Sequence, residues 1–284
     1  MTKTKFLKRS FYILVTLVIL MALALYGGSE MIINRHYDSG YVPLMIPRDS
    51  ASVQEGRRLV QIAHCSDCHG ADFGGKVFHK IDHVALLVAP DISRILPQYT
   101  DEQLERLLRR GVTKDGRAVW TMPAAMYHSV CDDSLAKMIA YLRTIPPSGA
   151  TRELPPLTFY LRGRLGVILG KLRPDAERLA DQPILHVASP DTTQLLWGKY
   201  LTATTCTSCH GVDLKGKEIV HSPNLVVAGA YSEEGFIHLL RTGEGGLGRK
   251  QLGIMSIVAK DHLSYLTEPE MKAIYAFLKN RSMK

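Results

Sequence analysis

The hydrophobic pattern of the chain begins with an almost unbroken apolar run, FYILVTLVILMALALY, at residues 11–26. It is preceded by four cationic side chains, those of Lys3, Lys5, Lys8 and Arg9. Positive charges flanking an apolar helix stay on the cytoplasmic side of a membrane. The pattern therefore predicts a basic cytoplasmic segment at residues 1–10 and a transmembrane anchor at residues 11–27. We expect a single-pass protein of the bacterial cytoplasmic (inner) membrane, with all downstream residues in the periplasm.

A removed signal peptide is the alternative interpretation of this run. The run is slightly short for a membrane span, and Ala22-Leu23-Ala24 resembles a small-residue cleavage site. We favour the uncleaved anchor, because Gly27 and Gly28 can end the helix at the outer interface. Leu25 would also be a less typical first residue of a mature protein.

Beyond this run, apolar residues recur at helical spacing, and the pattern occurs twice. Residues 131–143, CDDSLAKMIAYLR, align without a gap with residues 267–279, TEPEMKAIYAFLK, and both place apolar side chains three and four positions apart. Thr267 followed by Glu270 forms a capping-box pattern that predicts a helix start, whereas Cys131 occupies the equivalent place in the first copy. Each copy therefore ends in a helix.

The match extends upstream of these terminal helices. Residues 99–102 and 107–109 align with residues 231–234 and 239–241, and the segment CSDCHGADFGGK parallels CTSCHGVDLKGK. Helices are expected near Gln54–Cys65, Thr100–Arg110 and Asp132–Arg143 and at the equivalent positions of the second copy.

The repeat predicts an all-α fold with two small tandem domains behind the N-terminal helix, because no period-two strand pattern stands out. We place the first domain at residues 50–147, an interdomain linker at 148–187 and the second domain at 188–281. The linker contains the apolar stretch LTFYLRGRLGVILGKL. We favour packing against the domains for this stretch, and the alternative is a contact with the membrane surface or a partner.

Composition and charge narrow the possible functions. The chain is 46% hydrophobic and 22% charged, as globular proteins are, but only 7% aromatic. A large flat cofactor would supply apolar volume that such cores lack. The net charge of +8 falls to about +4 without the four N-terminal cations, and no basic stripe is interleaved with aromatic residues. Binding to nucleic acid is therefore not expected.

Each repeat begins with a Cys-x-x-Cys-His motif. The motif residues are Cys65, Cys68 and His69 in the first unit and Cys206, Cys209 and His210 in the second. Two cysteines three positions apart on a helical turn project to one side, where both thiols can reach one porphyrin, and the following His lies beneath the iron. A zinc site would bring its cysteine pairs closer in sequence, and a dithiol oxidoreductase would show a βαβ pattern. The motifs therefore predict two covalently bound haem c groups.

A methionine in each unit is the candidate for the second axial iron ligand. Met122 and Met255 lie in the loops that lead to the terminal helices, and a thioether opposite His raises the reduction potential of a haem. Met126 competes with Met122. Histidines could serve instead, namely His79, His83 and His128 in the first unit and His221, His238 and His262 in the second.

Five further residues have expected roles around these sites. Pro90 and Pro223 can position a backbone carbonyl for the ring N–H of the haem-ligating His, and the alternative is a rigid loop turn that makes no haem contact. Arg109 and Arg241 either pair with haem propionates or are solvated cations at helix ends. Once the remaining cysteines bind haem, Cys131 is either a free thiol or part of a bridge to another chain, and we expect an inert, partly buried thiol.

These residues also resemble those of class I cytochrome c domains. The shared features are Cys-x-x-Cys-His-Gly, a Pro-Asp or Pro-Asn loop, and a Met before a helix that ends in Ala-Tyr-Leu or Ala-Phe-Leu. With an N-terminal anchor, the tandem is similar to the cytochrome subunits of membrane-associated alcohol and gluconate dehydrogenases. Those subunits typically carry three such domains and often have Met-Pro, whereas this chain has two and shows Met255-Ser256.

The function predicted from these features is relay of single electrons. The donor would be a membrane-associated dehydrogenase or another respiratory, quinol-oxidising component, and the electrons would pass to a downstream acceptor. No general base, nucleophile or substrate pocket is visible in the sequence, so we expect a non-catalytic carrier or a subunit of an oxidoreductase complex. The alternatives are a dihaem peroxidase or sulfur-compound dehydrogenase with one open iron, and a haem-based sensor or assembly factor.

Overall fold

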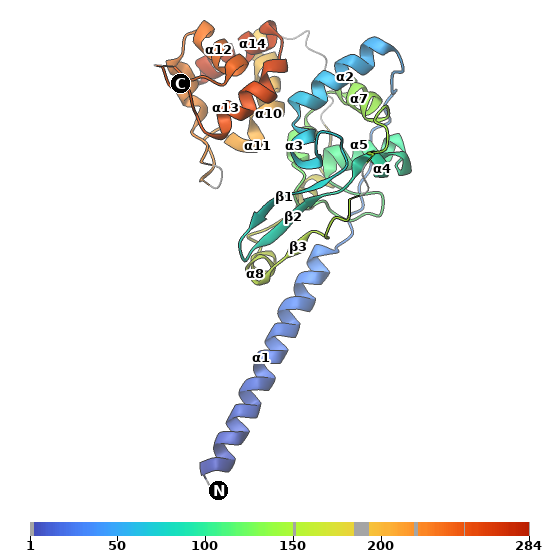
Figure 1. Cartoon of the computed structure of the whole chain (residues 1–284), viewed down its shortest axis with the longest axis vertical. Coiled ribbons are helices and arrows are strands. Elements are labelled where there is room, and N and C mark those ends of the chain that lie inside the picture. Colours follow the sequence, from blue (N-terminus) through green and yellow to red (C-terminus); the bar gives the residue numbers. More distant parts are fainter. Residues whose placement is uncertain (1–2, 150–151, 185–192, 219–220, 247, 284) are drawn as a thin grey trace.

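The computed structural model is mostly helical, as expected, with one long N-terminal helix and two helical units (Figure 1). It describes residues 3–149, 152–184, 193–218, 221–246 and 248–283. The expected boundary between linker and second domain, at residues 187 and 188, lies outside these described residues.

Helix α1, Lys3–Ile33, projects away from the rest of the molecule (Figure 1). Within the described residues it is the one helix long and apolar enough to cross a membrane, over Leu7–Ile33, with a mean hydropathy of 2.3. The helix does not end at Gly27 and Gly28, which corrects our expectation. A helical Gly costs only about 1 kcal/mol relative to Ala, and contacts made by the extra turns beyond these glycines offset that cost.

The first unit contains six α-helical segments and one 3-10 turn. They are α2 (Ser50–Ile62), α3 (Cys65–His69), α4 (Ile92–Ile95), η1 (Leu96–Gln98), α5 (Asp101–Arg110), α6 (Ala124–His128) and α7 (Asp132–Leu142). The three helices expected from sequence periodicity correspond to α2, α5 and α7.

The second unit follows a similar order, with η3 in place of α4 and η1 and with η4 added before its last helix. Its elements are α10 (Gln194–Thr205), α11 (Thr207–His210), η3 (Leu225–Ala230), α12 (Glu233–Thr242), α13 (Ile254–Asp261), η4 (Leu263–Tyr265) and α14 (Glu268–Ser282). The capping box expected at the start of α14 is present, with Thr267 accepting from the Glu270 backbone and Glu270 accepting from the Thr267 N–H.

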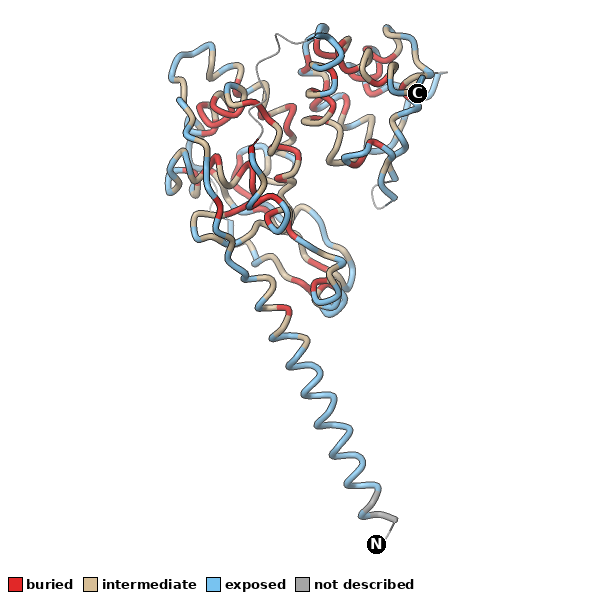
Figure 2. Tube along the Cα trace, turned by 180° about the vertical axis from the view of Figure 1, so that it is seen from behind, coloured by how far each residue is buried: buried red, intermediate tan, exposed pale blue. Residues whose placement is uncertain are grey.

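The first and last helices of each unit cross at a glycine, which explains part of the sequence repeat. A Cβ atom on Gly56 of α2 would lie 1.9 Å from the Lys137 carbonyl oxygen of α7. A Cβ atom on Gly198 of α10 would lie at the same distance from the Ala273 carbonyl oxygen of α14. Only a residue without a side chain allows these backbones to approach so closely. Each crossing closes a buried apolar core, seen in red in Figure 2.

A small antiparallel sheet, which the sequence analysis did not predict, extends from the first unit. Strands β1 (Lys76–Ile81) and β2 (Ala85–Ala89) form a hairpin, and β3 (Thr158–Phe159) pairs with β2. The hairpin is an insertion, because 21 positions separate His69 from Pro90 while 13 separate His210 from Pro223. Strand β1 faces mostly solvent, so it lacks the apolar alternation that marks a half-buried strand.

The linker packs against the first unit and α1, as we favoured. Helix α8 (Leu161–Ile168) lies beside the end of α1, and α9 (Ala176–Leu179) packs on α5 and α6. Arg110 of α5 holds the segment after α9 by donating to the carbonyl oxygens of Leu179 and Ala180, at 3.2 and 2.6 Å.

The two units touch through side chains that are far apart in sequence. Arg58 of α2 donates to both carboxylate oxygens of Glu270 in α14, at 2.7 and 2.9 Å. Ile62 of the first unit belongs to the apolar core cluster of the second. The Cys131 backbone N–H donates to the Tyr200 hydroxyl at 3.2 Å. The contact therefore combines an ion pair, an apolar contact and a hydrogen bond.

Candidate haem attachment sites

Both Cys-x-x-Cys-His motifs form a short helical turn at matching places. Helix α3 follows His64, which has a left-handed φ of 60°, and ends at Gly70, with φ 84°. Helix α11 ends in the same way at Gly211, with φ 81°. All four motif cysteines are free and partly buried. The turns therefore present two unpaired thiols each, as covalent attachment of a porphyrin requires.

The motif histidines are oriented by backbone carbonyls, which confirms the expected role of the two prolines. His69 Nδ1 lies 3.0 Å from the Pro90 carbonyl oxygen, and His210 Nδ1 lies 2.9 Å from that of Pro223. Because a carbonyl only accepts, Nδ1 carries the proton and Nε2 keeps its lone pair. Burial lowers the pKa of both histidines, which favours this neutral form. Each imidazole is thus prepared to bind a metal through Nε2.

The motif thiols do not have the environment of a redox-active cysteine pair. Burial raises the pKa of Cys65 to about 12 and that of Cys206 to about 11. A reactive cysteine instead has a lowered pKa, since the thiolate is the nucleophile. The residues in both turns therefore fit covalently attached haem better than thiol exchange.

The candidate methionine ligands lie in equivalent surroundings. Met122 and Cys65 are both partly buried against the core of the first unit, and Met255 and Cys206 are both partly buried against the core of the second. Met126 is different, because it is 3% exposed and belongs to the core itself. Met122 and Met255 thus share the partly buried setting of the motif cysteines, and this favours Met122 over Met126 as the candidate ligand.

The histidines proposed as alternative ligands have different partners or face solvent. His128 bonds the Arg109 carbonyl oxygen at 3.1 Å, and His238 pairs with Glu244 at 3.2 Å. The exposed ones are His79, His83 and His221. His262 reaches across to the first unit, where its Nε2 lies 2.9 Å from Asp67 Oδ1.

Arg109 has a different role from those expected, whereas Arg241 is an exposed cation at a helix end, as the second alternative describes. Arg109 is fully buried and bonds Glu105, the Val130 carbonyl oxygen and Asp132, so it is a core residue and neither a propionate partner nor a solvated cation. Arg241 is half exposed and pairs with Glu268 at 2.9 Å. Arg109 and Arg241 occupy matching positions in the repeat, but only Arg109 is buried.

Cys131 is buried, which agrees with the expected inert thiol and is more complete than the partial burial expected. Its side chain is 4% exposed, and its sulfur lies 3.1 Å from the Ser134 hydroxyl oxygen. It caps α7 at the contact between the units, so oxidation or pairing with another chain would require that contact to open.

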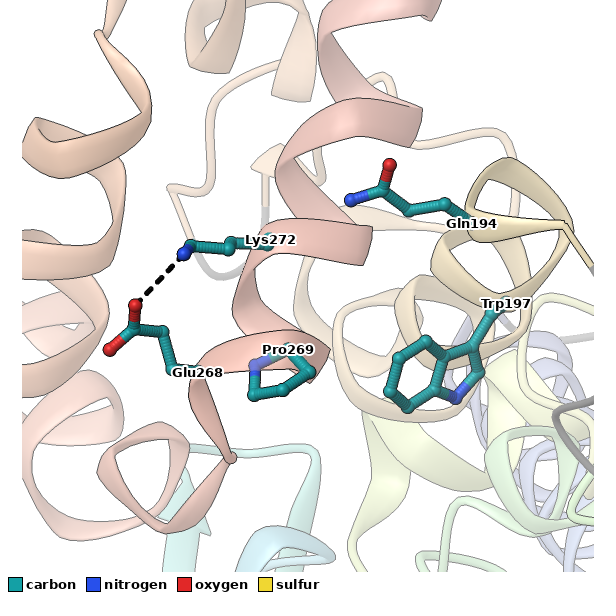
Figure 3. Close-up of a pocket in the computed structure, with 5 residues that line it drawn as sticks. All are labelled: Gln194, Trp197, Glu268, Pro269 and Lys272. Atoms are coloured by element: carbon teal, nitrogen blue, oxygen red, sulfur yellow. Dashed lines mark ion pairs between the residues drawn. The ribbon is translucent and has the colours of Figure 1, made fainter.

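A surface pocket of about 500 Å³ lies between α10 and α14, away from both motifs in sequence (Figure 3). Its lining consists of Gln194, Trp197, Glu268, Pro269 and Lys272. Glu268 and Lys272 pair with each other at 2.9 Å, as Figure 3 shows. The pocket therefore offers an open groove with mutually neutralised charges rather than a group poised for acid or base chemistry.

Each attachment turn also makes a contact with the other unit that the sequence did not predict. Asp67 of α3 meets His262 of the second unit, and α11 packs against α6 of the first. Asp67 occupies a variable position of the motif, and His262 is expected from the sequence only as an iron ligand. No signal in either unit alone indicates that these residues meet.

Comparisons with known proteins agree with the geometry. The family model described as cytochrome c matches residues 53–146 and 197–282. The chain is 25% identical to the fructose dehydrogenase cytochrome subunit of Gluconobacter japonicus, over 81% of this chain and 52% of that protein. It is 24% identical to the cytochrome c subunit of the quinone-type alcohol dehydrogenase of Gluconobacter oxydans (strain 621H), over 71% of this chain and 45% of that subunit.

A third relative is the cytochrome c subunit of gluconate 2-dehydrogenase from Pantoea cypripedii. It is 23% identical, over 83% of this chain and 61% of the relative. The chain thus spans about half the length of the curated relatives it matches.

Proposed function

Because the chain belongs to the cytochrome c family, we propose that it is a membrane-anchored dihaem cytochrome that relays single electrons in the periplasm. Cys65 and Cys68 would hold one haem c and Cys206 and Cys209 the second. His69 and His210 would ligate the irons from one side, and Met122 and Met255 from the opposite side. Each haem c, when bound, supplies an iron that takes up and releases one electron.

The observation that carries this proposal is the position of both attachment turns at the contact between the units. Asp67, in the middle of α3, bonds His262 of the second unit, and α11 packs on α6 of the first unit. Carriers attached to turns that both lie at this contact could pass electrons from one unit to the other. The Arg58 pair with Glu270 joins the same two units.

The side chains around each site suit a carrier. The Pro90 and Pro223 carbonyls hold the imidazoles in one tautomer and orientation, so a change of oxidation state needs little movement of the ligands. A thioether on the opposite side favours the reduced form and closes the iron to small ligands. No residue of this chain is assigned a catalytic role.

The partner we propose is a membrane-associated dehydrogenase or a quinol-oxidising component, with electrons passing on to a downstream acceptor. The three relatives are named as cytochrome subunits of fructose, alcohol and gluconate dehydrogenases, which supports a donor of this class. The anchor at residues 11–27 would hold the domains at residues 50–147 and 188–281, joined by the linker at 148–187, on the periplasmic side. The basic segment at residues 1–10 would remain in the cytoplasm.

Carbon monoxide titration of the reduced full-length protein tests this function. With both irons closed by methionine, we expect almost no carbon monoxide binding, and intact mass should show two covalently attached haems. The same mass measurement shows whether the N-terminal helix is retained or whether the purified protein begins at Leu25, as a cleaved signal peptide would leave it. Stoichiometric binding of carbon monoxide to one haem would contradict the carrier and favour the dihaem enzyme or the sensor.

A further inference from the structure

Three side chains able to bind a metal ion meet where the two units touch. His64 and Asp67 come from the first unit and His262 from the second, and their ligand atoms all lie within 4.8 Å of one another. His64 Nδ1 lies 3.3 Å from Asp67 Oδ2, and His262 Nε2 lies 2.9 Å from Asp67 Oδ1. Both imidazoles therefore face one carboxylate.

The orientation of His262 is fixed by a second contact. Its Nδ1 lies 2.8 Å from the Gln61 carbonyl oxygen of the first unit, and the side chain is 5% exposed. Because a carbonyl only accepts, Nδ1 carries a proton, and a neutral ring directs the Nε2 lone pair towards Asp67. Metal-binding histidines are held in this way, with the second ring N–H donated to a backbone carbonyl. The Nε2 lone pair of a neutral His262 would repel the Asp67 carboxylate. The contact is therefore favourable only if Nε2 also carries a proton or if a cation binds between the two groups.

We propose that His64, Asp67 and His262 bind one divalent transition-metal ion, with zinc as the best match, that bridges the two units. Zinc accepts imidazole nitrogen and carboxylate oxygen at about 2.0–2.2 Å in a tetrahedral arrangement, which separates ligand atoms by about 3.4 Å. His64 Nδ1 and His262 Nε2 approach different oxygens of the Asp67 carboxylate, at 3.3 and 2.9 Å, and the three ligand atoms all lie within 4.8 Å of one another. The three side chains are therefore close enough together to share one ion. Three protein ligands leave the fourth position to water.

The haem attachment turn itself does not require these side chains. In the aligned second motif, Thr205 and Ser208 stand where the first has His64 and Asp67. The second attachment turn therefore lacks both of the ligands that the first turn would contribute.

Zinc binding by the untagged, full-length, haem-loaded protein tests the site. After treatment with a chelator, calorimetric titration with zinc chloride and metal analysis after dialysis should both give one zinc per chain. His262→Gln and Asp67→Asn should each weaken binding about tenfold or more. The matched control is His238→Gln, which removes an exposed imidazole that faces only Glu244 and should leave zinc affinity unchanged.

Two results would overturn the metal site, and neither depends on a variant that fails to fold. Wild-type protein that takes up no zinc would show that His262 and Asp67 form only an ion pair. Equal affinity of wild type and His262→Gln, with the haem content of both retained, would show that zinc binds elsewhere on the surface.

A different observation concerns α8, whose exposed face is apolar. Leu161, Leu165, Ile168 and the following Leu169 form one stripe at helical spacing, and they are 70, 47, 37 and 62% exposed. The opposite side packs on the protein, since Val167 is fully buried and Gly163 lies against the Val84 carbonyl. The stripe is therefore an apolar surface that the two units leave uncovered.

Contacts with α1 determine where this stripe lies. Arg164 of α8 donates to Ser29 and Glu30 of α1 at 2.8 and 2.7 Å, and its guanidinium lies 4.0 Å from the centre of the Tyr26 ring. Figure 1 shows α8 alongside the end of α1 from which the two units continue. Ile168 of the stripe lies against Gly28 of α1, so the stripe borders the exposed apolar surface of the membrane-crossing candidate.

From this arrangement we infer that α8 lies on the outer surface of the lipid bilayer with its leucine stripe in contact with lipid. This inference rests on the anchor in the proposed function. A short interfacial helix buries its apolar face at the boundary of head groups and acyl chains. The Arg164 contacts then fix the first unit close to the membrane, together with the β1–β2 hairpin next to α8.

Nitroxide labels on the full-length protein in phospholipid nanodiscs test this contact. Leu165→Cys should give a label more accessible to oxygen than to a water-soluble nickel chelate, and Leu161→Cys should behave alike. Val212→Cys, on an apolar residue of the second unit that is 80% exposed, should show the opposite preference. The native Cys131 is buried and therefore protected from the label.

A label at Leu14→Cys separates failure of this contact from failure of the anchor. If residue 14 is in lipid and residue 165 is in water, α1 spans the membrane and α8 does not touch it. If both residues are in water, the anchor and the α8 contact are both wrong.

Discussion

Replacing Met122 with Ala is expected to lower the reduction potential of the haem on the first unit by on the order of a few tenths of a volt. If Met122 is the ligand that we propose, its loss removes a thioether that stabilises ferrous iron, and axial ligands set haem potentials over a range of about 0.8 V. The sulfur-to-iron charge-transfer band of that haem should disappear from the ferric spectrum. Potentiometric titration followed by absorbance would show one haem shifted and the second unchanged.

Met126→Ala is the matched control, because it removes a methionine four positions away. Met126 is 3% exposed within the core, so its truncation should cost about 2–5 kcal/mol of unfolding free energy and leave both potentials in place. Met255→Ala should shift only the haem of the second unit. If Met126→Ala shifts the potential and Met122→Ala does not, the ligand assignment is wrong.

Replacing Arg109 with Met is expected to destabilise the first unit by about 3–5 kcal/mol. The Arg109 guanidinium is fully buried, with Glu105 at 3.3 Å, the Val130 carbonyl oxygen at 2.7 Å and Asp132 at 2.6 Å. Without the guanidinium, the buried Glu105 carboxylate loses its cationic partner. It then either stays charged, at the full cost of removing that charge from water, or takes up a proton. Chemical denaturation followed by haem absorbance measures the loss.

The repeat supplies the control for this substitution. Arg241 stands at the matching position of the second unit, and it pairs with Glu268 where both side chains are about half exposed, 50 and 48%. Exposed ion pairs contribute only about 0–1 kcal/mol, so Arg241→Met should be nearly neutral. If both variants lost a similar amount of unfolding free energy, burial of Arg109 would not be the cause of the destabilisation.

Much of each unit could be predicted because its signals are local. The capping box at Thr267 and Glu270, the helical spacing of α7 and α14, and the positions of Pro90 and Pro223 all involve residues close in sequence or repeated in the second unit. Local patterns of this kind favour a helix start, a helix or a turn without help from distant residues. The structure has these elements at the predicted positions.

The incorrect expectations concern residues whose surroundings are set by distant segments. Arg109 and Arg241 have the same helical context, and only the enclosure around Arg109 made it a core residue. Gly27 and Gly28 remain helical because α8, more than a hundred residues later, contacts the following turn. The solvent-facing strand β1 carries no periodic signal that would identify it.

The sequence alone determined the attachment chemistry, because two thiols and an imidazole within five consecutive residues form one helical turn in any fold that accepts them. It also determined the duplication and the apolar N-terminal helix. Only the tertiary structure decided how the units meet. The hydrogen bond between His262 and the Gln61 carbonyl joins residues 201 positions apart, and no periodicity within either unit encodes such a contact. The shape and charge of two separately folded surfaces determine this contact. The proposed metal site, and the contact of each attachment turn with the other unit, therefore appear only after the units dock.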